Sequence, residues 1–523
     1  MRRSGSRVAG KRTRDVAAIA LIAFLALTRG SARAAAEGAV APKASEKVSE
    51  KVSEKDADIV LPFREQTLGN GLRVLTLEDH SVPSVTYWTW FRVGSINERP
   101  GITGISHLFE HLMFRGARKY GPGEFDKALE SSGGYSNAFT DKDLTAYYED
   151  LISDKLELVI DLDSDRMASL NVTQAVLDPE RDVVKEERRF RTENSILGSL
   201  DEVLDAAAYL AHPYRWPIVG WMRDLDTISL EDCREYFRTY YAPNNATIIV
   251  VGDFRTAELI TMLDRYYGAI PRQPPPREVV NSEPPPRGER RLEFYKQAQV
   301  ETFGVAFRVP QVDAPGFYAM EILQSVLGSG RSSRLYKRLV YDAQAATNVS
   351  VYHEWRRQPG LLKIYVDMKP DRKAADGEKM LNEELARLRV EEIGDAEVQK
   401  AKNNIRASLI RQMKTNRGKG ELAGQFEILW GYWAKQKEFL KKIDGVTKED
   451  IKRAASLFLT DLNRTVVTLV PEEPPSLPPM QPEHFQQPSD EGEEEEEEEA
   501  GEDAGEEGGE SGEKGKSGAE GKP

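Results

Sequence analysis

The sequence is poor in residues that cross-link chains and in runs that could cross membranes. One cysteine, Cys233, and six histidines occur in 523 residues. A single cysteine cannot close a disulfide within the chain, so stability must come from packing. The apolar run from Val16 to Leu27 has twelve residues, whereas a membrane-spanning helix needs roughly 20. We therefore expect no stable membrane span.

Basic clusters are scarce as well. The formal net charge is −14, and residues 490–523 alone contain 16 Asp and Glu against three Lys. The sequence therefore indicates no surface for nucleic acid, which we do not expect as a partner. Glu493–Glu499 is an unbroken acidic run that cannot bury enough apolar surface to fold, so residues 472–523 are predicted to be a disordered acidic tail. The simple interpretation is solubilisation, and the alternative is capture of cations or basic proteins.

The N-terminus has the pattern of a targeting segment. Basic residues between Arg2 and Arg14 precede the apolar run, and Ala32-Arg33-Ala34 follows it. This order predicts a signal peptide at residues 1–34 and export to the periplasm or beyond, with retention as an anchor as the alternative. Residues 35–58 contain a short charged SEKV repeat and are predicted to be a low-complexity spacer.

The central part of the chain mixes helical and strand patterns. Apolar spacing predicts helices at 105–114, 125–131, 151–170 and 179–193, and β-branched or aromatic runs predict strands at 72–77, 85–91 and 246–251. Such a mixture, without a strict βαβ repeat, is typical of an α+β fold.

A proline-rich segment divides this central part in two. The length favours two hydrophobic cores, and a run of prolines forms a semi-rigid spacer. We predict a first domain at 59–270, a linker at 271–289 and a second domain at 290–471.

The second domain has the pattern of a diverged copy of the first. Ser229 and Asn245 have counterparts in Thr447 and Asn463, each 218 residues later and each in a helix, turn, strand context. A constant offset through two segments favours duplication over a coincidence between ordinary helix-strand junctions.

Two histidines and a glutamate form the most informative cluster. His107 and His111 are four residues apart on a predicted helix, so both imidazoles project from one face, and Glu110 lies beside them. Histidine pairs of this kind also occur as ordinary core residues. Zinc in hydrolytic sites takes three protein ligands and leaves one position for water, so a metal site needs a third ligand from elsewhere.

Glu187 is the candidate for that third ligand. Asp178 is a good N-cap and Pro179 suits a first helical position, which predicts a helix starting there. Glu180 and Glu187 are two turns apart and share a face, so one carboxylate can bind the metal while the other supports it. The alternative is a solvated helix face, because charged residues surround Glu187.

The motif from His107 to His111 resembles the signature of inverted zincins, in which the glutamate directly precedes the second histidine. With several further stretches between residues 60 and 471, the chain is similar to the insulinase and pitrilysin family, which includes the mitochondrial processing peptidases. The resemblance implies one Zn²⁺ per chain, held by His107, His111 and Glu187. It also implies that Glu110 is the catalytic general base and that Glu180 supports the site.

The resemblance carries further expectations about fold and substrate. It implies two homologous α+β domains, each a mostly antiparallel sheet packed with helices, joined by the linker into a clamshell. It implies an endopeptidase that hydrolyses short or unfolded polypeptides by glutamate-assisted attack of an activated water. Asn137, Ala138 and Phe139 are expected on a strand that pairs with the peptide substrate, although a turn role for Asn137 is the alternative from composition alone.

One departure from the family pattern bears on partners. Residues 321–330 align with 107–116 but contain no histidine. Where family members that complete the site in one chain have an Arg and a Tyr, this chain has Val340 and Thr347. We therefore expect a homologous non-catalytic subunit or a homodimer. Tyr336 or Tyr341 could serve instead if the alignment is shifted, and a catalytically silent scaffold subunit is the alternative function.

Overall fold

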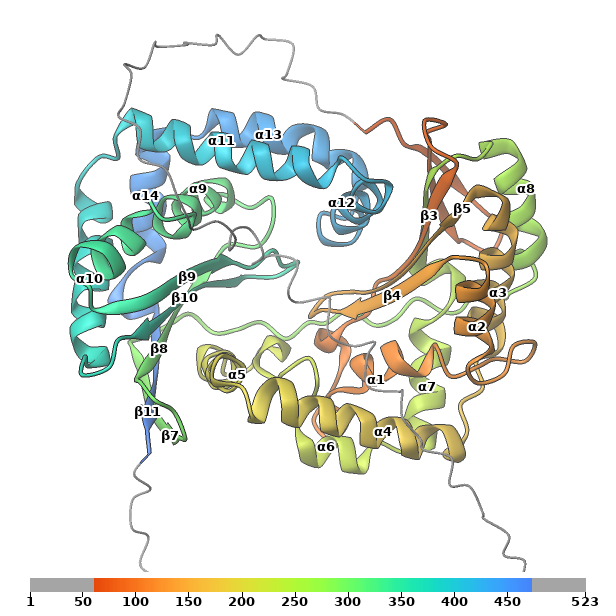
Figure 1. The fold of residues 1–523 in the computed structure, drawn as a ribbon, viewed down its shortest axis with the longest axis horizontal. Helices are drawn as coiled ribbons and strands as arrows, with labels where there is room; N and C mark the ends of the chain where they lie inside the picture. Colours follow the sequence, from red (N-terminus) through yellow and green to blue (C-terminus); the bar gives the residue numbers. More distant parts are fainter. Residues whose placement is uncertain (1–60, 473–523) are drawn as a thin grey trace, which may run out of the picture. The chain divides into compact units, whose positions relative to one another are not determined.

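The computed structural model describes residues 61–472, which contain two β-sheets surrounded by helices (Figure 1). The predicted signal peptide and spacer, and the predicted tail from residue 473 onward, lie outside the described residues. Among the helices of residues 61–472, none is long and apolar enough to cross a bilayer.

The first sheet has six strands in the order β1-β2-β6-β3-β5-β4. Only the β2–β6 pair is parallel. The strands are β1 (Arg64–Thr67), β2 (Arg73–Glu78), β3 (Ser84–Phe91), β4 (Tyr135–Thr140), β5 (Thr145–Ile152) and β6 (Ala246–Gly252). Strand β4 is therefore an edge of this sheet.

The second sheet has five strands in the order β7-β11-β8-β10-β9, and again a single parallel pair, β7–β11. The strands are β7 (Arg290–Lys296), β8 (Thr302–Val309), β9 (Ala346–His353), β10 (Gly360–Met368) and β11 (Arg464–Pro471). Apart from β1, the two sheets have the same strand order and the same mixture of directions. Both features agree with the predicted α+β class and support duplication.

The helices follow the same division. Those of the first part are α1 (Ile105–Leu112), α2 (Glu124–Ser131), α3 (Leu156–Ser169), α4 (Gln174–Arg188), α5 (Ile196–Ala208), α6 (Met222–Thr227), α7 (Leu230–Tyr240) and α8 (Thr256–Tyr267). Those of the second part are α9 (Phe317–Gly328), α10 (Ala374–Val390), α11 (Asp395–Gln412), α12 (Asn416–Leu429), α13 (Gln436–Gly445) and α14 (Lys448–Phe458). The predicted helix at 151–170 starts too early, because Leu151 and Ile152 still pair in β5.

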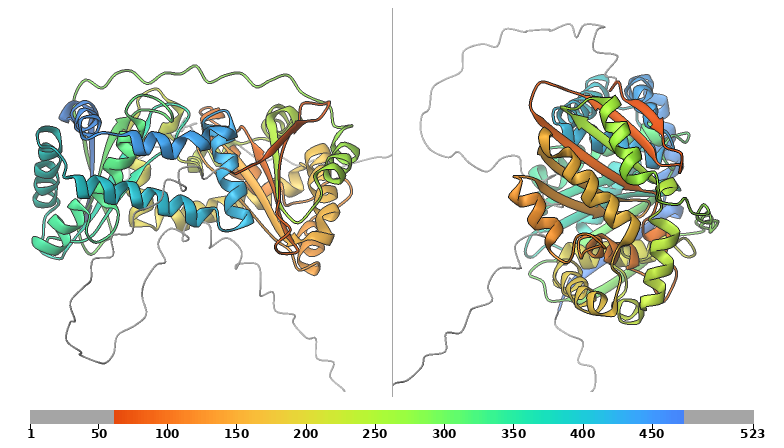
Figure 2. Two further views of the ribbon diagram at one scale, coloured as in Figure 1. Left: turned by 90° about the horizontal axis from the view of Figure 1, so that it is seen from above. Right: turned by 90° about the vertical axis from the view of Figure 1, so that its right-hand side faces the viewer.

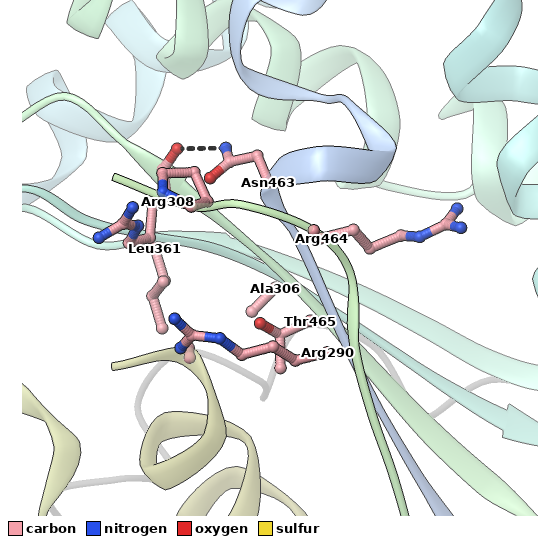
Figure 3. Close-up of a pocket in the computed structure, with 10 residues that line it drawn as sticks. Arg290, Ala306, Arg308, Leu361, Asn463, Arg464 and Thr465 are labelled. Atoms are coloured by element: carbon pink, nitrogen blue, oxygen red, sulfur yellow. Dashed lines mark hydrogen bonds between the residues drawn. The ribbon is translucent and has the colours of Figure 1, made fainter. Parts of the chain in front are cut away.

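Matching helix caps and turns also support the duplication. Ser229 and Thr447 each start a helix, α7 and α14, with a capping box completed by an aspartate three residues later. Asn245 and Asn463 each donate a side-chain hydrogen bond to the backbone oxygen of the residue five positions earlier. Asn463 also donates to the Arg308 backbone oxygen at 2.8 Å, as drawn in Figure 3.

Two helices pack on the sheet of the other part of the chain. Helix α5 contacts β8 and β11 of the second sheet, whereas α12 contacts β3 and β6 of the first. The two helices are themselves counterparts, since Ser195 and Thr415 cap them in the same way, each accepting a bond from the glycine three residues on. Figures 1 and 2 show α12 against the first sheet, on the face opposite α3 and α8.

The α12 contact depends on two glycines. A β-carbon on Gly424 would lie 2.0 Å from the Trp90 ring, and one on Gly420 would lie 2.5 Å from the Trp88 ring. These tryptophans are buried and stack at a centroid separation of 5.2 Å. Only glycine lets the helix backbone approach the rings this closely.

A small pocket lies where α5, the linker and the second sheet meet. Arg290, Arg308 and Arg464 are among its lining residues (Figure 3). Its volume of about 10 Å³ holds no more than one water molecule. The pocket is therefore too small for a substrate.

Candidate metal centre

Helix α1 is fixed at its start by a glycine and a buried carboxylate. Gly104 has a φ of 91°, and a β-carbon there would lie 2.5 Å from the Val219 oxygen. The carboxylate of Glu98 accepts hydrogen bonds from the backbone N–H groups of Gly104 and Ser106, both at 2.9 Å. These bonds satisfy N–H groups that a helix N-terminus leaves without partners.

The apolar face of helix α1 is fully buried, and this packing determines where the opposite, polar face of the helix points. Ile105, Leu108, Phe109 and Leu112 have at most 1% of their surface exposed. Their spacing is that of one helix face. The histidines are therefore directed away from these side chains, toward α4, which packs against α1.

The structure brings His107, His111 and Glu187 together. Nε2 of His111 lies 3.1 Å from Oε2 of Glu187, and Nε2 of His107 lies 3.6 Å from the same oxygen. The three ligand atoms all lie within 4.8 Å of one another, and within residues 61–472 no other group of three or more His, Cys, Asp or Glu is arranged to hold a metal. Two imidazoles from one helix and a carboxylate from another thus converge at one point.

These atoms fit a zinc ion. Tetrahedral ligands that each lie about 2.05 Å from zinc are about 3.3 Å apart, close to the two nitrogen–oxygen separations found here. Glu187 Oε2 is buried, with the His111 and His107 imidazoles beside it. A buried carboxylate oxygen is costly unless a cation or a hydrogen-bond donor binds it.

Glu180 lies on α4, two turns before Glu187, and contacts His111. Its Oε1 lies 3.0 Å from Nδ1 of His111. It also accepts a bond from Arg115 at 3.1 Å, and only 3% of its surface is exposed. A carboxylate that holds the outer nitrogen of a histidine fixes the ring so that the other nitrogen faces the metal.

The helix that carries both glutamates is longer than predicted. It begins at Gln174 rather than Pro179, and Thr173 rather than Asp178 occupies the N-cap position. Leu177 is fully buried, so packing of this additional turn outweighs the hydrogen bond that the internal Pro179 removes. The prediction that Glu180 and Glu187 share a face does not depend on this boundary.

Two arginines also contact the glutamates of the site. Arg191, on a π-helical turn at Arg189–Glu193, lies 2.7 Å from Oε1 of Glu187, and Arg115 contacts Glu180. Arg191 is four residues after Glu187, and Arg115 is four residues after His111. On a helix this spacing predicts the contact of Arg191 with Glu187, whereas for Arg115 it predicts only a position on the side of His111.

The residues of the cluster differ in the direction in which their pKa values are shifted. Burial lowers the pKa of His111, but hydrogen bonds to Glu180 and Glu187 outweigh it and raise the pKa to about 9. Burial dominates at His107 and lowers its pKa. At Glu187, burial raises the pKa, but the hydrogen bond from His111 and the charges of both histidines lower it to about 2. Glu187 is therefore an anion, as a metal ligand must be.

Glu110 lies on the same helix and is half-buried. Its charge raises the pKa of both His107 and His111.

The predicted substrate strand lies next to α1. Asn137, Ala138 and Phe139 are in the middle of the edge strand β4, which contacts α1. Ala138 is buried on the α1 side of the sheet, and Phe139 packs against Trp90 on the other side. Asn137 accepts a bond from the Ala138 N–H and donates to the Tyr135 hydroxyl. The roles of these three residues stay predictions.

The second part of the chain has no counterpart of the histidines. Helix α9 corresponds to α1, and its N-cap, Gly316, has a φ of 92° like that of Gly104. Matching these glycines shifts the predicted alignment by two residues and pairs His107 with Ala319 and His111 with Leu323. The alignment was wrong in detail, but histidines are absent under either one.

The two residues at the positions where family members have an Arg and a Tyr lie in two different elements. Val340 lies on a π-helical segment, Tyr336–Asp342, and Thr347 lies on β9. Tyr341 is 74% exposed. Thr347 donates a hydrogen bond to the backbone oxygen of Asp367 on β10. This bond joins two strands of the second sheet.

Comparisons with known proteins identify relatives of this chain. Residues 73–220 match the family model described as insulinase (peptidase family M16), and residues 227–405 match the peptidase M16 inactive domain. Zinc protease PqqE of Helicobacter pylori is 30% identical over 426 residues, which cover 79% of this chain and 94% of that protein. The chain belongs to the insulinase family of peptidases, M16. The predicted resemblance is thereby confirmed.

Other relatives of this M16 chain extend the likeness. The probable mitochondrial-processing peptidase subunit beta of Arabidopsis thaliana is 24% identical and covers 78% of each chain. The crystal structure of a protease from Helicobacter pylori has a TM-score of 0.76 at 28% identity, and covers 79% of this chain and 100% of that one. The predicted two-domain α+β fold is confirmed.

Proposed function

We propose that this chain is a zinc-dependent endopeptidase that cleaves short or unfolded polypeptides. The observation that carries the proposal is the convergence of His107 Nε2, His111 Nε2 and Glu187 Oε2 within 4.8 Å. A zinc protease among the relatives supports it. Zinc held by these three atoms would acidify a water molecule and polarise the carbonyl of the scissile bond.

The chain's own residues would perform the proton transfers and the orientation. The Glu110 carboxylate would take a proton during attack on the carbonyl and deliver it to the leaving amine. Glu180 would hold His111 through Nδ1, so that its other nitrogen stays directed to the site. The backbone of β4 would pair with the substrate in an extended conformation.

Cleavage of an unstructured peptide tests this function. We expect the chain, assayed together with the proteins that copurify with it, to cleave such a peptide, to lose activity with a chelator and to regain it with added zinc. The matched variants are Glu187→Gln, which removes the ligand, and Glu186→Gln, which changes the neighbouring exposed glutamate that pairs with Arg189. Retention of activity by Glu187→Gln would contradict the proposal.

A catalytically silent scaffold subunit is the second candidate. The family model that matches residues 227–405 is described as an inactive domain, and the second part of this chain has no histidine at the positions of His107 and His111. A scaffold would bind no zinc and cleave nothing in the experiment above. The intact cluster on α1 and α4 favours the enzyme.

A partner subunit is part of the proposal. One relative is named as the beta subunit of a processing peptidase, and this chain has Val340 and Thr347 where an Arg and a Tyr are expected. A homologous subunit without zinc ligands, or a second copy of this chain, would supply these groups. Activity measured with and without proteins that copurify from the native source tests this, and full activity of the isolated chain would remove the need for a partner.

Export is proposed from the N-terminal pattern alone. Residues 1–34 would direct the chain to the periplasm or outside the cell and would be removed there. N-terminal sequencing of the native protein tests cleavage after residue 34.

A further inference from the structure

The turn that follows the proposed substrate strand is held on both sides. Asp141, Lys142 and Asp143 connect β4 to β5, and the turn closes through a bond from the Asp141 N–H to the Leu144 oxygen. The backbone oxygens of Asp141 and Lys142 accept bonds from the N–H groups of Ser95 and Ile96. One side of the turn is thus fixed by the segment that leads into α1.

The other side of the turn is held by the second part of the chain. Nη1 of Arg356 donates to Oδ2 of Asp141 at 2.6 Å, and the backbone N–H of Arg357 donates to Asp143 at 3.2 Å. Both arginines lie in the loop between β9 and β10, more than 200 residues away in the sequence. The part without metal ligands therefore contacts the end of β4 directly.

These contacts belong to a closed ring of alternating charges. The ring leaves the turn at Asp141 and returns to it at the next residue, passing through Asp141, Arg356, Glu354, Lys363, Asp205 and Lys142. The separations that follow the Asp141–Arg356 bond are 3.3, 3.1, 2.5 and 3.3 Å. Asp205 is on α5, the helix that packs on the second sheet.

Two cations of the ring, Arg356 and Lys363, remain charged. Burial lowers the pKa of Arg356, but Asp141, Glu354 and Asp143 outweigh it and hold the pKa well above its usual range. The same balance holds the pKa of Lys363 well above its usual range. Since buried ions that lose a partner are costly, the ring resists any displacement of the turn.

We propose that Arg356 is a positioning residue, through which the part of the chain without metal ligands fixes β4 beside the zinc site. This rests on the proposed function. A substrate that pairs with an edge strand takes its position from the backbone of that strand, and a misplacement of about 1 Å can cost on the order of a hundredfold in rate. Arg356 acts through Asp141 and touches no reacting group.

A purely structural ion pair between the two parts provides the control. Lys419 on α12 donates to Asp79 after β2 at 2.6 Å. This pair also joins the two parts, and its cation has 17% of its side chain exposed, against 10% for Arg356. It touches neither β4 nor its turn.

The experiment compares Arg356→Met, Arg356→Lys, Asp141→Asn and Lys419→Met in the full chain, with zinc content, melting temperature, kcat and KM for an unstructured peptide. We expect Arg356→Met to keep its zinc and to lose about 10- to 100-fold in kcat/KM. Arg356→Lys should recover part of this loss. Asp141→Asn, a change of equal size on a partly exposed side chain, should show the same loss even if Arg356→Met folds poorly.

Two results would overturn the inference. Arg356→Met and Asp141→Asn could lower the melting temperature with kcat and KM unchanged, or Lys419→Met could lose as much kcat/KM as they do. Either would make Arg356 part of an ordinary interface. Failure of the zinc-loaded wild-type chain to cleave any peptide, even with its copurifying proteins present, is a different outcome, because it removes the proposed function itself.

Discussion

Nδ1 of His111 lies 3.0 Å from Glu180, while Nε2 of the same ring lies 3.1 Å from Glu187. One imidazole thus connects two carboxylates of a single helix, α4, and Glu180 holds its outer nitrogen. This arrangement predicts that Glu180 affects metal affinity without touching the metal.

Glu180→Gln should weaken zinc binding by about 10- to 100-fold. Glutamine can still accept a bond from His111 but loses the charge that favours the orientation of the ring. Competition with a chelator of known affinity measures the change. Glu186→Gln should leave the affinity unaltered, and equal affinities for both variants would exclude a supporting role for Glu180.

Glu110→Gln should retain zinc but lose at least about a hundredfold in kcat, a typical contribution of general acid-base catalysis. The reason is that the amide cannot accept the proton. Zinc content and turnover of an unstructured peptide, measured on the same preparation, check this. Unchanged turnover would show that another group takes the proton.

The stability of the chain should depend on pH through Glu98, at the start of α1. Burial raises the pKa of this carboxyl to about 8, although bonds from Ser106 and Gly104 oppose the shift. Since the folded pKa is above the unfolded value, the protonated form stabilises the fold below pH about 4.5, and this stabilisation is lost as the pH rises through about 8.

Urea unfolding of the wild type and of Glu98→Gln at pH 5 and pH 8 measures this effect. The wild type should lose several kcal/mol relative to the variant between the two pH values, since glutamine does not titrate. If the difference in unfolding free energy between the wild type and Glu98→Gln is the same at both pH values, Glu98 is ionised in the folded chain.

Gly424→Ala should lower the free energy of unfolding by about 1–3 kcal/mol, because its β-carbon would lie 2.0 Å from the Trp90 ring. Gly445→Ala is the control, since nothing lies within 4 Å of a β-carbon there. Urea denaturation compares the two. A Gly424→Ala variant as stable as Gly445→Ala would mean that α12 can shift away from the first sheet at little cost.

The local parts of this site follow from the sequence. The spacing of His107 and His111 on a helix, and of Glu180 and Glu187 on another, depends only on helix periodicity. The start of α4 was misplaced, because burial of Leu177 extends the helix beyond the boundary that Pro179 suggests. Boundaries set by packing are not encoded by local propensity.

The long-range parts could not be predicted. Packing of α5 on the second sheet and of α12 on the first depends on shape, such as the fit of Gly424 against Trp90. The contact of Arg356 with Asp141 joins residues 215 positions apart, and no periodicity links them. The pairing of His107 with Ala319 rather than Glu321 needed the matching backbone turns at Gly104 and Gly316.

Zinc stoichiometry tests the central claim most directly. The wild-type chain should bind one Zn²⁺ tightly. The variants His107→Ala, His111→Ala and Glu187→Gln should each abolish tight binding, whereas Glu186→Gln should not. Elemental analysis after dialysis gives the count. The account predicts one zinc in the wild type and in Glu186→Gln and none in the other three variants. One zinc retained in Glu187→Gln, or none in the wild type, would contradict it.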